Sequence, residues 1–87
     1  MKAVIVDDTR LARQELQFLL KNYKDVQVIG EAENVDDAQK LIEELKPDLI
    51  FLDIQMPGKD GFELLEMLDE VPQVIFTTAY SEYAIKA

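Results

Sequence analysis

The chain alternates short apolar runs with longer segments in which apolar residues recur every three or four positions. Mostly continuous apolar runs of this length are typical of strands that are covered on both faces of a sheet. These runs are residues 3–6 (AVIV), 26–29 (VQVI), 49–52 (LIFL) and 74–76 (VIF). The pattern therefore predicts four strands separated by helical segments.

Three helices are predicted between the strands, because each intervening segment has an apolar face with helical spacing and a polar residue that can cap its start. The apolar faces are Ala12, Leu16, Leu19, Leu20 and Tyr23 in the first, Val35, Ala38, Leu41, Ile42 and Leu45 in the second, and Leu64, Leu65 and Leu68 in the third. The candidate caps are Asp8 or Thr9, then Asn34, then Asp60. A short fourth helix is expected from Ser81 onward.

Strands that alternate with helices favour a parallel sheet with right-handed crossovers. The sequence therefore predicts an α/β fold with a doubly wound sheet. In open sheets of this kind, ligands bind beyond the carboxyl ends of the strands, at the point where the strand order reverses. Residues that directly follow the strands are therefore the first candidates for a functional site.

Polar side chains do follow these strands. Asp7 and Asp8 come directly after the first strand, Asp53 after the third, and Thr77 and Thr78 after the fourth. If the first and third strands are neighbours, three carboxylates converge at one edge of the sheet. Clustered anions repel one another unless a cation lies among them or their pKa values rise. A site built from oxygen ligands alone suits Mg²⁺ or Mn²⁺ better than zinc.

Each acid also has a simpler interpretation. Asp8 alone would more often cap a helix, and Asp53 alone would often begin a turn. The combination at one sheet edge favours a functional site instead. The loop after Asp53 is also shaped, because Pro57 fixes its own φ and either Gly58 or Gly61 can adopt positive φ.

The composition narrows the chemistry available to this site. The 87 residues include 18 acidic and 9 basic side chains, with a formal net charge of −9, which disfavours nucleic acid and anionic membranes as partners of this domain. The chain has no cysteine and no histidine, which excludes disulfides, thiol nucleophiles and histidine-based triads. No apolar stretch approaches the roughly 20 residues of a membrane span, so we expect a soluble, cytoplasmic, single-domain protein.

Three segments carry a resemblance to a known family. The stretches "VIVDDTRLARQEL", "DLIFLDIQMPGKDGFELL" and "VIFTTAYSEYAIKA" resemble the receiver domain of bacterial two-component response regulators. The segments "DIQMPG" and "TTAYSEYAIKA" are most similar to those of regulators with a LytTR-type DNA-binding output domain. The resemblance implies a flavodoxin-like (CheY-like) sheet and a role in transcription regulation by phosphorelay signal transduction.

The resemblance also implies a role for each site residue. Asp53 corresponds to the phosphoacceptor, which receives a phosphoryl group from a sensor histidine kinase. Asp7 and Asp8 correspond to Mg²⁺ ligands, together with Asp53 and the backbone carbonyl of Gln55. Thr78 corresponds to the hydroxyl that senses the phosphoryl group. Such a domain is a switch for an output domain and not an enzyme in its own right.

The sequence departs from the family pattern at its C-terminal side. The family has a fifth strand, which ends in a lysine that pairs with the phosphoryl group, and a last helix. We expect a receiver domain over residues 1–87 with the strand order 2-1-3-4, truncated before both elements. Lys59 lies in the loop after Asp53 and Lys86 in the last helical segment, so neither takes the place of that lysine. Without a fifth strand, residues 74–76 would form an exposed edge, through which self-association is expected.

Two other functions are consistent with parts of the pattern. A haloacid-dehalogenase-like phosphatase also has a nucleophilic aspartate after a strand, but it needs a second acid two residues later, where this chain has Gln55. A pseudo-receiver would act only as an interaction or dimerisation module without phosphorylation. Its expected signature, the loss of an acid from the cluster, is absent here because Asp7, Asp8 and Asp53 are all present.

Overall fold

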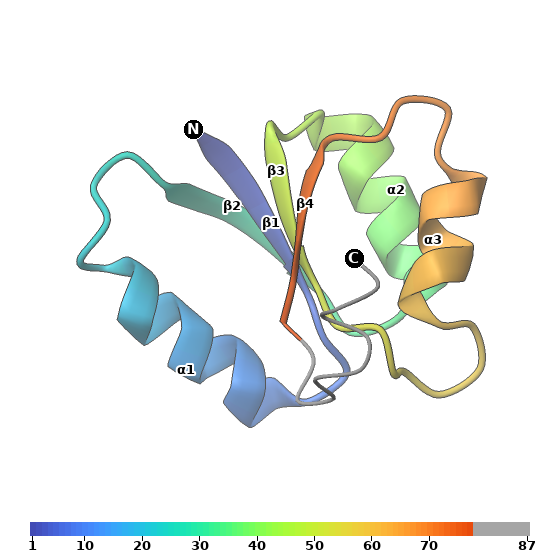
Figure 1. Cartoon of the computed structure of the whole chain (residues 1–87), viewed down its shortest axis with the longest axis horizontal. Coiled ribbons are helices and arrows are strands. Elements are labelled where there is room, and N and C mark those ends of the chain that lie inside the picture. Colours follow the sequence, from blue (N-terminus) through green and yellow to red (C-terminus); the bar gives the residue numbers. More distant parts are fainter. Residues whose placement is uncertain (78–87) are drawn as a thin grey trace.

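The computed structural model describes residues 1–77 and shows a parallel four-stranded sheet with helices on both faces (Figure 1). The strands are β1 (Lys2–Val6), β2 (Gln27–Ala32), β3 (Leu49–Leu52) and β4 (Gln73–Phe76), and the helices are α1 (Arg10–Leu20), α2 (Val35–Leu45) and α3 (Gly61–Met67). The strand order is β2-β1-β3-β4 with all pairs parallel, which confirms the predicted α/β fold and order. The helix predicted from Ser81 lies outside the described residues.

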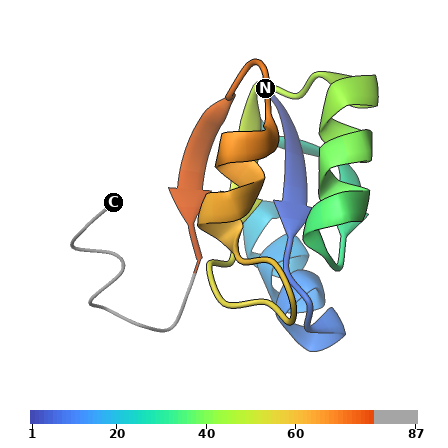
Figure 2. The ribbon, with the colours of Figure 1, turned by 90° about the vertical axis from the view of Figure 1, so that its right-hand side faces the viewer.

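The central strands are covered on both faces, as their continuous apolar runs predict. Ile5 is 1% exposed, and Ile50 and Leu52 are completely buried. The fourth strand differs, as expected for an exposed edge, because Ile75 of β4 is 48% exposed. The reason is that β4 lies at the edge of the described sheet, where α1 does not reach it (Figures 1 and 2).

Two apolar layers lie on opposite faces of the sheet, because successive side chains of a strand point to opposite sides. Val4 and Ile50 belong to the layer under α2 and α3. Ile5 and Phe51 belong to the layer that packs against α1 (Figure 1). The layer under α1 is the smaller one, since only Leu16 and Leu20 of this helix pack on it.

The two predicted caps of α2 and α3 are confirmed. The side chain of Asn34 accepts a hydrogen bond from the N–H of Asp37 at 2.8 Å, which satisfies one free donor of the first turn of α2. Asp60 and Glu63 form a capping box, in which each side chain accepts a hydrogen bond from the backbone N–H of the other. Both helix starts are therefore determined by local sequence.

The predicted apolar face of α1 is only partly correct. Leu16 and Leu20 are half-buried, but Leu19 is 57% exposed and Tyr23 is 63% exposed and lies beyond the end of the helix. A contact with one sheet face buries only a narrow stripe of an 11-residue helix, and residues i and i+4 occupy it. Thr9 occupies the N-cap position but its side chain makes no capping bond, and Asp8 is not the cap.

The second strand is longer than predicted and irregular. It begins one residue after Val26 and continues to Ala32, because it pairs with β1 along its whole length. The register shifts between Ala3 and Val4, where β1 pairs with Val28 and then with Gly30. One extra residue of β2 is accommodated at this β-bulge.

We expect the chain to self-associate through the exposed edge of β4. Ile75 presents an apolar side chain on a strand that has no neighbour on its outer side among residues 1–77, and such an edge pairs readily with a second copy. Ile75→Lys should shift the chain towards monomer, as measured by sedimentation velocity at micromolar concentration. Phe18→Lys, a change at a 68% exposed side chain on α1, is the control for added charge. A wild-type chain that sediments as a monomer would contradict this prediction.

Candidate functional site

The parallel register brings three polar residues to the carboxyl edge of the sheet. Asp7, Asp53 and Thr77 each follow the last residue of a strand. Each donates its backbone N–H to the neighbouring strand, and the acceptors are the carbonyl oxygens of Ala32 at 3.1 Å, Val6 at 2.9 Å and Leu52 at 2.9 Å, respectively. The backbone hydrogen bonds between neighbouring strands thus continue one residue beyond the strands and fix the positions of the Cα atoms from which these side chains extend.

The expected convergence of three carboxylates is present. Each of Asp7, Asp8 and Asp53 offers an oxygen, and these atoms all lie within 4.8 Å of one another. Asp7 is buried at 8% exposure, Asp53 is half-buried and Asp8 is exposed. The cluster is therefore open to solvent on the side of Asp8 and closed on the side of the core.

The fold places these carboxylates in an unfavourable environment. Burial, followed by repulsion from Asp7 and Asp8, raises the pKa of Asp53 to about 6, although the Gln55 N–H donates to its Oδ1 at 3.3 Å. Burial also raises the pKa of Asp7, against the hydrogen bond that its Oδ1 accepts from the Thr9 N–H at 2.9 Å. Both carboxyl groups would be more readily ionised beside a cation.

The donor set fits a hard divalent cation. All three side chains present carboxylate oxygens, the ligands that Mg²⁺ and Mn²⁺ prefer. Because these oxygens all lie within 4.8 Å of one another, a single cation could be shared among the three side chains. Gln55 follows Asp53 by two residues, and the ligation by its backbone carbonyl stays a prediction.

The loop after Asp53 is held by the core on one side and by turn geometry on the other. Ile54 is 1% exposed and Met56 is 8% exposed, so both side chains anchor the loop in the protein interior, Met56 in the layer under α2 and α3. Gly58 has φ 79°, a left-handed conformation that favours glycine. Of the two glycines proposed for positive φ, the structure therefore selects Gly58.

Gly61 has a different role, which the sequence pattern did not reveal. A Cβ at this position would lie 2.7 Å from the carbonyl oxygen of Asp53 and 3.0 Å from the Cα of Ile54. The Gly61 N–H also donates to the Ile54 carbonyl at 2.8 Å. The absence of a side chain lets the start of α3 approach the backbone of Asp53 and Ile54.

Arg13 is a second residue that the sequence reasoning missed. Its Nη1 donates to the backbone carbonyl of Asp7 at 2.7 Å, and its Nε lies 2.9 Å from Oε1 of Glu31 on β2. The available signal was an arginine one turn into the helix that follows the acidic pair. Its partner on β2 could not be identified from that signal alone.

The structure describes Thr77 and Lys59 but not Thr78. Thr77 lies directly after β4, but Thr78 lies outside the described residues. Lys59 forms an exposed ion pair with Asp36 at 2.9 Å, so its charge is directed to the first turn of α2.

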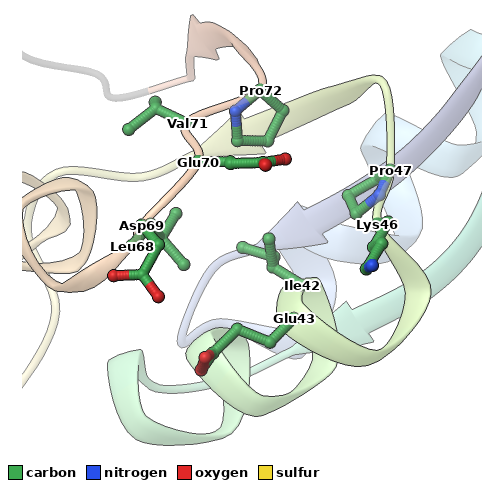
Figure 3. Close-up of a pocket in the computed structure, with 9 residues that line it drawn as sticks. All are labelled: Ile42, Glu43, Lys46, Pro47, Leu68, Asp69, Glu70, Val71 and Pro72. Atoms are coloured by element: carbon green, nitrogen blue, oxygen red, sulfur yellow. The ribbon is translucent and has the colours of Figure 1, made fainter.

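A cavity of about 400 Å³ lies at the opposite end of the sheet (Figure 3). It is formed where α2 ends and where the chain runs from α3 into β4, near the amino ends of the strands. Its lining residues are Ile42, Glu43, Lys46, Pro47, Leu68, Asp69, Glu70, Val71 and Pro72. This cavity is separate from the acidic cluster, which lies at the carboxyl ends.

The cluster of Asp7, Asp8 and Asp53 at the carboxyl ends of the strands is called the acidic edge below. The fold and the acidic edge define a class of signalling domain, and comparison with known proteins identifies the family. Residues 3–87 match the family model of the response regulator receiver domain, and the chain belongs to this family. Among the described residues, no helix is long and apolar enough to cross a membrane.

Several curated relatives are similar along the whole chain. It is 49% identical to an uncharacterized response regulatory protein of Vibrio cholerae, 44% to the sensory transduction protein LytT of Bacillus anthracis and 46% to the transcriptional regulatory protein BtsR of Salmonella typhi. Each alignment includes 100% of this chain but only 38%, 37% and 37% of the length of the respective relative. The relatives named LytT support the resemblance to the LytTR-type branch.

Solved structures agree with this assignment. The response regulatory domain of mrkE from Klebsiella pneumoniae superposes with a TM-score of 0.84 at 36% identity, covering 100% of this chain and 74% of that one. A LuxR-family two-component response regulator from Aurantimonas sp. SI85-9A1 superposes with a TM-score of 0.87 at 26% identity, covering 98% and 64%.

Gly61→Ala should destabilise the chain and distort the acidic edge, because the new Cβ meets backbone atoms that cannot rotate away. We expect a loss of about 1 to 3 kcal/mol in urea unfolding. Gly58→Ala is the matched control, since it strains a positive φ but meets no atom within 4 Å. Gly58→Ala should cost about 1 kcal/mol and leave metal affinity unchanged, whereas Gly61→Ala should also weaken metal affinity. Equal metal affinity in both variants would show that Gly61 does not support the site.

The raised pKa of Asp53 predicts a pH-dependent stability in the absence of metal. The folded state holds this proton up to about pH 6, above the ordinary value of 3.8, so deprotonation costs stability as the pH rises between these values. Asp53→Asn should therefore stabilise the metal-free chain at pH 7 by about 1 to 2 kcal/mol, after allowance for solvent screening. The gain should vanish near pH 4 when both proteins are unfolded in urea. A gain of equal size at both pH values would contradict the linkage.

Proposed function

We propose that this receiver domain of a two-component response regulator accepts a phosphoryl group on Asp53 from a sensor histidine kinase, with Mg²⁺ bound at the acidic edge. The observation that carries the proposal is the group of three carboxylates within 4.8 Å, at the point of the sheet where the strand order reverses. Membership in the receiver family supports the same assignment.

The chemistry requires a nucleophile, a leaving group and charge neutralisation. A carboxylate oxygen of Asp53 attacks phosphorus, an O–P bond forms, and the P–N bond to the histidine of the kinase breaks as the imidazole leaves. Since the raised pKa of Asp53 is only about 6, the nucleophile is mostly ionised at neutral pH. The chain therefore needs no histidine of its own.

The residues around Asp53 have complementary roles in this proposal. Asp7, Asp8, Asp53 and the backbone carbonyl of Gln55 would hold the cation. A cation held there would supply charge neutralisation for the phosphoryl oxygens. The Gln55 N–H fixes one oxygen of Asp53, which leaves the carboxylate in a defined orientation.

The switching role belongs to Thr78 in this proposal. Its hydroxyl would contact the new phosphoryl oxygens and shift the segment that follows it between two states. Thr77, which precedes it, donates its N–H to the Leu52 carbonyl at 2.9 Å and so ties the end of β4 to β3. The relatives LytT and BtsR are named as sensory transduction and transcriptional regulatory proteins, which supports a DNA-binding output domain as the receiver of the signal.

The test is phosphorylation of a regulator that contains this chain, with acetyl phosphate or a histidine kinase as donor. Intact mass should show one added phosphoryl group that depends on Mg²⁺ and is lost in base, as expected for an acyl phosphate. Asp53→Asn should abolish the adduct, and Asp8→Asn should reduce its rate at least about 10-fold, because one metal ligand is lost. Lys59→Ala, which removes an exposed ion pair, is the control and should leave the rate unchanged.

Two results would contradict the proposal. A base-stable adduct on Thr77, Thr78 or Ser81 would move the phosphoacceptor away from Asp53. No adduct under any condition, together with retained self-association, would favour the pseudo-receiver, which acts only as an interaction module.

A further inference from the structure

Arg13 lies where α1, β2 and the turn between β1 and α1 meet. Its guanidinium donates through Nη1 to the Asp7 carbonyl at 2.7 Å and through Nε to Glu31 Oε1 at 2.9 Å. Gln17, one turn further along α1, donates to the other carboxylate oxygen of Glu31. The Arg13 side chain is only 14% exposed, so it is held by contacts on several sides.

The carbonyl that Arg13 holds belongs to the peptide group that joins Asp7 to Asp8. A peptide group is planar, so the direction of its carbonyl sets the direction in which the chain enters Asp8. The preceding peptide group is fixed as well, because the Asp7 N–H donates to the Ala32 carbonyl at 3.1 Å. The sheet thus orients the chain before Asp7, and Arg13 orients it after Asp7.

We propose that Arg13 is a positioning residue for the cation site: it holds the Asp7–Asp8 peptide group so that both carboxylates face Asp53. This inference rests on the proposed function of the acidic edge. It assigns no contact between Arg13 and the cation, since the guanidinium donates to the backbone oxygen of Asp7 and to Glu31.

The planar fork of arginine is essential to this role. It supplies two donors in fixed directions, one for the Asp7 carbonyl and one for the Glu31 carboxylate. A lysine supplies a single charged nitrogen and cannot keep both directions fixed. The ion pair between Lys59 and Asp36 has the same 2.9 Å length, but its side chains are 48% and 67% exposed, so it is a suitable comparison.

The positioning role predicts the sign of the effect on cation affinity. Removing a positive charge near the cluster should strengthen cation binding if Arg13 acts only through its charge. Removing a residue that orients two ligands should weaken it instead, by about 10- to 100-fold for a group of this kind. The direction of the change therefore distinguishes the two explanations.

The experiment is a Mn²⁺ titration of the purified chain followed by electron paramagnetic resonance, which counts the free ion. It is carried out well below the unfolding temperature of each variant. Arg13→Ala should raise the Kd for Mn²⁺ about 10-fold or more, and Arg13→Lys should recover only part of the affinity. Glu31→Gln should have a smaller effect, because the bond to the Asp7 carbonyl remains. Lys59→Ala should bind like the wild type.

Asp8→Asn separates this inference from the proposed function. If the wild type does not bind Mn²⁺, or Asp8→Asn binds it equally well, the proposed cation site is wrong. If Asp8→Asn loses affinity while Arg13→Ala binds like the wild type or more tightly, the site stands and the role of Arg13 is wrong. Reduced stability with unchanged affinity of the folded fraction would likewise overturn it. If Arg13→Ala does not fold, wild-type affinity in Arg13→Lys would overturn it.

Discussion

The parallel pairing of β1 with strands on both sides is the constraint on which the rest of the structure depends. Its residues Ala3–Val6 are at most 1% exposed, so a slip of one residue would turn core side chains towards the wrong layer. The register therefore fixes the ends of β1 and β3 against each other. Asp7 and Asp53 follow those ends directly, and their convergence is a consequence of core packing and not of any attraction between them.

The carboxylates of the acidic edge repel one another, and the packed core keeps them close together. Ile54 and Met56 bury their side chains on either side of Gln55, so the loop cannot swing away to separate Asp53 from the other acids. The cost appears as the raised pKa of Asp53 and of Asp7. Locally unfavourable groups that the surrounding fold holds in place are typical of functional sites.

Much of this arrangement could be predicted from the sequence, because it depends on local signals. The caps at Asn34 and Asp60 need only a partner three residues away, and the strands show as apolar runs. The exposed face of α1 could not be predicted, since the helix contacts the sheet along a narrower stripe than its apolar residues suggest. The close approach at Gly61 depends on the distance between two backbones, which no sequence pattern specifies.

The bulge between β1 and β2 has a consequence for side-chain parity. Ile29 and Gly30 both face α2, since Ile29 packs in that layer and a Cβ on Gly30 would meet Leu41. Two consecutive residues on one face reverse the alternation, which places Glu31 opposite Ile5 on the face of α1. A regular strand would turn this carboxylate towards α2, away from Arg13. A single inserted residue in β2, remote from the acids in sequence, thus determines that Glu31 lies on the side of α1, where Arg13 can bind it.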